Sequence, residues 1–131
     1  MAIILNTTQH KLPAKFVEKV DTDGVSFVME LRDVDPELFD RLSNCPFDRG
    51  LLAKLADDFI RLLCEYPYQD GYVVVFPIGS PAFNAILWTR IACTPSMSDV
   101  SINFLHSRRI VSDDGNGKKI VTFKYDGYIT L

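Results

Sequence analysis

The chain has 131 residues, of which 47% are hydrophobic and 24% are charged, and its formal net charge is −3. A chain of this size and composition is expected to form a single globular domain, residues 1–131, with a core large enough to fold without disulfides or a structural metal. The composition excludes a disordered chain.

Cysteine and histidine usage argues against a metal site. The three cysteines, Cys45, Cys64 and Cys93, are odd in number and form no C-x-x-C pair. Each has apolar neighbours, so we expect small buried thiols in a reducing compartment and a cytoplasmic protein. His10 and His106 have no cysteine at ligand spacing. We therefore expect no metal and no cofactor.

The N-terminal third predicts three strands. Residues 2–5 form a short apolar run, and residues 14–20 alternate in part, with Phe16 and Val20 on one side. Residues 21–24, Asp-Thr-Asp-Gly, are typical of a turn, and residues 25–31 alternate well. The pattern predicts a hairpin of 14–20 with 25–31, and a helix at 14–20 is the alternative.

Two helices should follow. Asp35-Pro36-Glu37 combines a capping carboxylate, a first-turn proline and an acid near the positive end of the helix dipole, which predicts a short helix over residues 36–43. From Asp48 to Tyr66, apolar residues recur every three or four positions. This second helix should cover one face of a sheet.

Between Asp70 and Asp99 the chain has one charged residue, Arg90. Residues 72–78 predict a strand covered on both faces, because its apolar residues are consecutive. Gly79-Ser80-Pro81 supplies a turn, a cap and a first-turn proline for a helix over 82–93. The prolines and Gly79 argue against a membrane span, so we expect no membrane association.

The predicted helix 82–93 is apolar around most of its circumference, which is typical of a deeply buried helix or one shared with another subunit. We expect a homodimer, and the candidate interface residues are Phe83, Leu87, Trp88 and Ile91.

The C-terminal residues predict two long strands and a short one. Residues 100–111 alternate until the pattern slips, which suggests a bulge around His106–Arg109. Residues 112–117 are turn formers, 118–125 form the returning strand, and Asp126-Gly127 suggests a tight turn into a last strand. The predicted fold is α+β, with a mainly antiparallel sheet of five or six strands and two or three helices packed on it.

Charge is unevenly distributed. Residues 21–70 contain twelve acids and five bases, which leaves −7 there and +4 in the rest. An acidic face for a basic protein partner would explain this, and so would ordinary solvated helix surfaces. Bases gather on the last hairpin, but Asp113 and Asp114 lie there too and the pI is near 5.3, so we expect no nucleic-acid partner.

Two functional hypotheses follow from these features. The first is a non-enzymatic binding or interaction protein, bacterial in its compactness and of immunity or antitoxin type, because no catalytic constellation is apparent. The alternative is a small-molecule-binding or hydrolytic protein with an aromatic pocket. Its candidate ligand-binding residues are Tyr66, Tyr68, Tyr72, Trp88 and His106. The same tyrosines could equally cover the rim of the core, and Ser80 is better explained as a helix cap than as a nucleophile.

Overall fold

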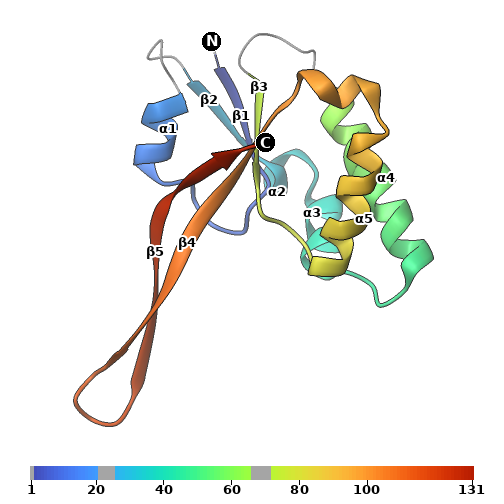
Figure 1. The fold of residues 1–131 in the computed structure, drawn as a ribbon. Helices are drawn as coiled ribbons and strands as arrows, with labels where there is room; N and C mark the ends of the chain where they lie inside the picture. The colour runs from blue at the N-terminus through green and yellow to red at the C-terminus, as the bar shows by residue number, and fades with distance from the viewer. Residues whose placement is uncertain (1, 21–25, 66–71) are drawn as a thin grey trace.

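The computed structural model describes residues 2–20, 26–65 and 72–131 (Figure 1). Within these residues the chain forms five strands and five α-helices, and a 3₁₀ helix follows the last of them. In chain order the elements are β1 (Ala2–Asn6), α1 (Ala14–Val20), β2 (Ser26–Glu30), α2 (Leu31–Val34), α3 (Pro36–Ser43), α4 (Arg49–Glu65), β3 (Tyr72–Phe76), α5 (Pro81–Ala92), η1 (Pro95–Asp99), β4 (Ser101–Asp113) and β5 (Lys119–Thr130).

The described strands form one mixed sheet in the order β2-β1-β3-β4-β5. Strand β1 is parallel to both β2 and β3, and β3 is parallel to β4. Only the β4–β5 pair is antiparallel. The prediction of a mainly antiparallel sheet was therefore wrong, although the fold does combine helices with a five-stranded sheet.

The error began at residues 14–20, which form helix α1 and not a strand. Phe16 and Val20 are four residues apart, a spacing that places two side chains on one face in either a strand or a helix. Because α1 carries the chain back across the sheet, β2 runs parallel to β1 and not antiparallel to a preceding strand. The turn predicted at residues 21–24 lies outside the described residues.

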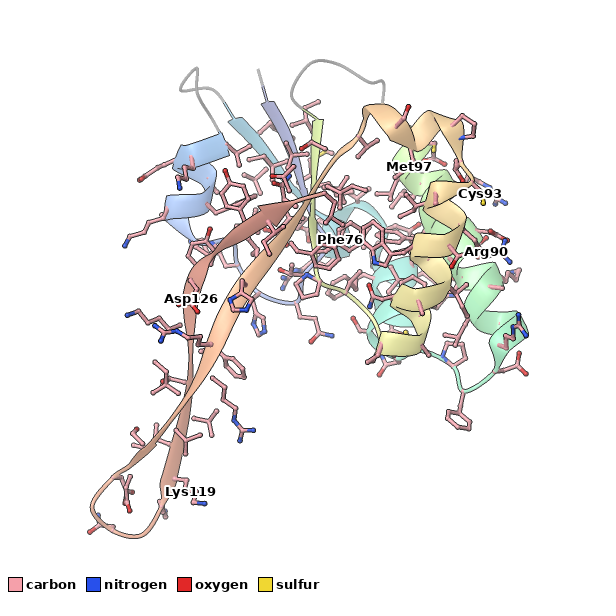
Figure 2. The ribbon with its side chains drawn as sticks, in the orientation of Figure 1. Phe76, Arg90, Cys93, Met97, Lys119 and Asp126 are labelled. Atoms are coloured by element: carbon pink, nitrogen blue, oxygen red, sulfur yellow. The ribbon has the colours of Figure 1, made fainter. Side chains whose placement is uncertain are left out.

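One face of the sheet is covered by α3, α4 and α5, and it holds the larger core (Figure 1). Phe76 of β3 lies at its centre, with ring centroids 5.9 Å from Phe59, 5.5 Å from Trp88 and 5.4 Å from Phe104. Figure 2 shows Phe76 between the sheet and the helices. The amphipathic pattern predicted for α4 is confirmed, because its large apolar side chains other than Leu51 pack into this core, while Leu51 is exposed.

The other face of the sheet is covered by α1. Its smaller core contains Phe16, together with Ile4 of β1 and Val73 and Val75 of β3. Val74 and Phe76, which alternate with these valines, belong to the larger core. The prediction that β3 is covered on both faces is confirmed.

The turn before α5 forms as the sequence predicts. Ser80 caps the helix, since its hydroxyl accepts a hydrogen bond from the Phe83 N–H at 3.1 Å. Gly79 has a φ of +79°, and a Cβ at this position would lie 2.6 Å from the Phe83 ring. Glycine is therefore needed here both for the backbone conformation and for the close approach of the ring.

Two sequence expectations about cysteines and membranes can be compared with the structure. Cys45 and Cys64 are partly buried, but Cys93 is exposed, so the expectation of three buried thiols was wrong for Cys93. Across residues 2–20, 26–65 and 72–131, helices long and apolar enough to span a bilayer are absent.

Candidate interaction surface on the β4–β5 arm

Strands β4 and β5 extend well beyond the rest of the sheet. Strand β4 pairs with β3 only over residues 101–104, whereas its pairing with β5 continues to Asp113. We call residues 107–124 the arm. Seven residues of β4 lie in it, and at ~3.3 Å per residue they reach about 23 Å. Figure 1 shows the arm projecting away from both helical layers.

The arm is exposed along its whole length. Every residue from 106 to 124 is exposed to solvent, including five large apolar side chains. Phe123 is the most exposed of these at 71%, and Val111 follows at 52%. The others are Ile120, Val121 and Ile110. An isolated two-stranded hairpin is only marginally stable in water, so this apolar surface favours an arm that is covered by another molecule.

The two faces of the arm differ in composition. Directly paired residues share a face, and the face continuous with the α1 core can be followed from Tyr128 and Tyr125 outward. This α1-side face carries Arg109, Val111, Asp113, Lys119, Val121 and Phe123. The opposite, helix-side face carries Arg108, Ile110, Ser112, Ile120, Thr122 and Lys124. Both faces therefore present apolar side chains flanked by charged ones.

A β-bulge marks the root of the arm. His106 pairs with Gly127 and Ser107 pairs with Tyr125, so Asp126 has no partner across the ladder. Its carboxylate accepts a hydrogen bond from Arg108 Nε at 2.8 Å, and its other oxygen lies 3.5 Å from His106 Nδ1. The bulge predicted near His106 is confirmed, but the turn predicted at 126–127 was wrong, because β5 continues through it.

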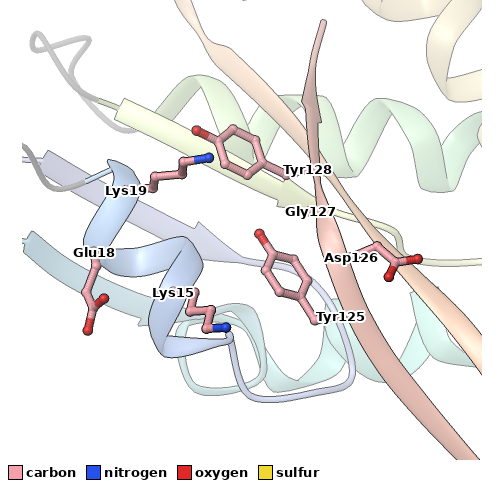
Figure 3. Close-up of a pocket in the computed structure, with 7 residues that line it drawn as sticks. All are labelled: Lys15, Glu18, Lys19, Tyr125, Asp126, Gly127 and Tyr128. Carbon is pink, nitrogen blue, oxygen red and sulfur yellow. The ribbon is translucent and has the colours of Figure 1, made fainter.

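The same root borders a groove of ≈ 760 Å³ between α1 and β5 (Figure 3). Lys15 and Lys19 extend from α1 toward Tyr125 and Tyr128, while Asp126 points away from α1. Lys19 Nζ lies 6.0 Å from the centroid of the Tyr128 ring. Burial and the adjacent Tyr128 raise the pKa of Tyr125 above its ordinary value of 10.0. Glu18 and Asp126 also line the groove, which therefore combines two bases, two acids and two tyrosines that sequence reasoning did not bring together.

Of the five predicted pocket residues, the structure describes the side chains of two, Trp88 and His106. Tyr66 and Tyr68 lie outside the described residues, and of Tyr72 only the backbone in β3 is described. Trp88 packs in the larger core, 5.3 Å from Phe104 between ring centroids. His106 is instead exposed at the root of the arm, beside Asp126. Neither Trp88 nor His106 lines the groove of Figure 3.

The predicted interface residues of α5 lie in or against the core. Phe83 and Leu87 are fully buried within the chain. Trp88 and Ile91 are partly buried and pack against the same core. The apolar circumference of α5 is thus largely used inside the domain, and an interface on this helix stays a prediction.

In the described part of the acidic segment 21–70, several carboxylates contact groups of the same chain. Asp35 and Asp48 accept hydrogen bonds from backbone N–H groups in the first turns of α3 and α4. Asp58 lies 3.0 Å from the guanidinium of Arg41. These contacts explain part of the acidity by helix capping and ion pairing. An acidic face for a basic protein partner, an immunity-type role and a cytoplasmic location stay predictions.

The point where the strand order reverses, beside β1, is where open α/β sheets commonly bind ligands. Here the polar groups at the end of β1 and in the loop after it form hydrogen bonds within the chain. The Asn6 amide donates to His10 O and to Glu30, each at 2.8 Å, and its oxygen accepts from Thr8. The Thr7 hydroxyl donates to Val75 O at 2.6 Å. These buried groups hold the loop after β1, so the arm is the stronger candidate for function.

Other chemistry is limited in the part of the chain that the structure describes. There, no group of three or more His, Cys, Asp or Glu side chains could hold a metal ion. The His106–Asp126 pair lies on the opposite side of the ribbon from Ser107, its nearest hydroxyl in sequence. No protein-family model, curated protein or solved structure matches this chain.

Proposed function

We propose that this protein is a non-enzymatic interaction protein that forms a homodimer through the β4–β5 arm. The observation that carries the proposal is the exposure of five large apolar side chains on a ribbon that none of the described helices covers. Burying such surface stabilises an association by ~25 cal/mol per Å² before the entropic cost of binding is subtracted.

A protein surface fits the arm better than nucleic acid does. The arm has five bases and two acids, and a two-stranded ribbon can enter the major groove of DNA. At the tip, Asp113 and Asp114 lie across the turn from Lys118 and Lys119, so the end of the arm that would enter the groove first has no net positive charge. Phe123 and Val111 gain most from an apolar partner surface, which a protein supplies.

Sedimentation velocity over a dilution series tests the proposal. We expect a dimer for the wild-type chain and a dissociation constant at least ~30-fold higher for Phe123→Ser, because a central aromatic residue contributes ~2 kcal/mol or more to an interface. Leu51→Ser is the matched control, since Leu51 is 55% exposed but lies on α4. A wild-type chain that stays monomeric into the high micromolar range would refute the homodimer.

The same variants distinguish the nucleic-acid alternative. Fluorescence anisotropy with a labelled DNA duplex should show no salt-sensitive binding by the wild-type chain. If the duplex binds, and Arg109→Ala weakens that binding while Phe123→Ser leaves it unchanged, the arm contacts nucleic acid and not protein.

The groove between α1 and β5 supports a second candidate function, the binding of a small anionic aromatic compound. Lys15 and Lys19 would meet the negative charge, and Tyr125 and Tyr128 would contact the ring. The fluorescent probe 8-anilinonaphthalene-1-sulfonate has both features. We expect the double variant Lys15→Ala/Lys19→Ala to lose its fluorescence enhancement and Phe123→Ser to keep it. The opposite pattern would place the probe on the arm.

A further inference from the structure

We infer that two copies pair their arms antiparallel, α1-side face against α1-side face, so that Arg109 of each copy meets Asp113 of the other. This inference rests on the homodimer proposed above and specifies its geometry. The pairing of Arg109 with Asp113 of the second copy follows from the order of charges along β4.

Along the α1-side face, β4 presents a cation, an apolar residue and an anion in sequence. Arg109 lies nearest the root, Val111 in the middle and Asp113 nearest the tip. Among the described residues, neither Arg109 nor Asp113 forms an ion pair. Asp113 uses one oxygen to accept the Gly115 N–H at 2.9 Å, and its second oxygen can accept from another molecule.

A two-fold axis through the middle of the arm, at the Ile110–Thr122 pair, makes this pattern complementary to itself. Reversing one arm places the root of each against the tip of the other, so Arg109 lies diagonal to Asp113 of the second copy. The same operation brings Phe123 opposite Val121 of the second copy. Val111, Val121 and Phe123 then lie nearest the axis together with Arg109, while Asp113 and Lys119 lie toward the rim of the interface.

Reversing one arm also brings other side chains of the α1-side face opposite residues of the second copy. Lys119, cross-strand from Asp113 at the tip, comes opposite Tyr125 at the root of the second copy, where its ammonium can lie over the ring. Parallel arms related by a two-fold axis would bring together the two α1 helices, which pack on this same face at the root, and β4 of each copy would lie over β5 of the other, so Arg109 would not meet Asp113. The arm's helix-side face carries Arg108 and Lys124 without an acid on the same strands of the arm, so it offers no such self-complementarity.

Charge-swap variants test this geometry by sedimentation velocity. We expect Arg109→Asp and Asp113→Arg each to raise the dimer dissociation constant about tenfold, since each replaces two opposite-charge contacts by two like-charge contacts. The double variant Arg109→Asp/Asp113→Arg should dimerise within about threefold of the wild type. A mixture of the two single variants should form heterodimers, because one copy is then acidic at both positions and the other basic.

Two controls separate this geometry from general charge and folding effects. Lys124→Asp makes the same charge change as Arg109→Asp on the other face and should leave the dimer unchanged. Asp113→Asn keeps the acceptor for Gly115 and should weaken the dimer less than Asp113→Arg. If Phe123→Ser weakens the dimer but the charge variants do not, the homodimer stands and the antiparallel geometry is wrong. A monomeric wild-type chain overturns both.

Discussion

Strand β3 and the arm both carry large apolar residues, but these residues are buried in β3 and exposed in the arm. Val73, Val74, Val75 and Phe76 of β3 are at most 6% exposed, because helices lie on both faces of the sheet there. The five large apolar residues of the arm are at least 40% exposed, because no element of the described residues covers either face. The comparison teaches that β-propensity builds both strands, while burial depends on what is packed over them.

The largest expected effect on stability comes from comparing one substitution in β3 with one in the arm. Phe76→Ala should lower the free energy of unfolding by ~3–5 kcal/mol, because it leaves a cavity among the rings of Phe59, Trp88 and Phe104. Phe123→Ala, measured by urea unfolding at concentrations below dimerisation, should cost less than ~0.5 kcal/mol. Similar costs at both positions would mean that the arm belongs to the folded core.

Two glycines with similar φ angles, one beside the core and one at the arm tip, allow the same comparison. Gly79→Ala should destabilise the protein by roughly 2–4 kcal/mol, since it adds strain at φ +79° and a clash with the buried Phe83 ring. Gly115→Ala at the arm tip has φ +84° but open space around the new Cβ, so it should cost only ~1–2 kcal/mol. Urea unfolding measures both, and equal losses would show that backbone strain alone accounts for the effect at Gly79.

The β-bulge at the root of the arm should contribute less to the free energy of unfolding. Asp126→Asn weakens the charge-assisted hydrogen bond from Arg108, which is more than half exposed, and we expect a loss of about 0.5–1 kcal/mol. Glu18→Gln on the exposed side of α1 provides the control for removing one acid. Should the two variants unfold at the same urea concentration, the Arg108–Asp126 contact would not stabilise the root of the arm.

The smallest effect concerns Tyr125, where the arm meets the α1 core. Burial raises its pKa, so its phenol should ionise above the ordinary value of 10.0 when absorbance at 295 nm is followed. Because the folded-state pKa exceeds the unfolded value, the associated stability is present below pH 10 and is lost as the pH rises through the raised pKa. Tyr125→Phe should therefore remove a part of the titration that lies above pH 10.0. If it removes a part at or below the ordinary value, Tyr125 is not shielded from solvent.

Local signals in the sequence determined the elements that carry strong caps or one clear period. Asp35 and Ser80 cap helices where the sequence predicts them, and α4 buries its apolar face. The slip of alternation near Leu105 also marked the position of the register shift, although the extra residue, Asp126, lies on β5. In each case the signal comes from hydrogen bonds or side-chain spacing within a few residues, which local sequence specifies.

Only the tertiary structure decided how these elements meet. The four-residue spacing of Phe16 and Val20 fits both a strand and a helix, and choosing the helix changed an antiparallel sheet into a mostly parallel one. Whether Phe123 is core or surface depends on helices that lie elsewhere in the chain. The candidate site was missed for the same reason: strand register joins Arg108 to Asp126, and α1 packing brings Lys15 near Tyr125. Contacts between residues far apart in sequence leave no periodic signal in either segment.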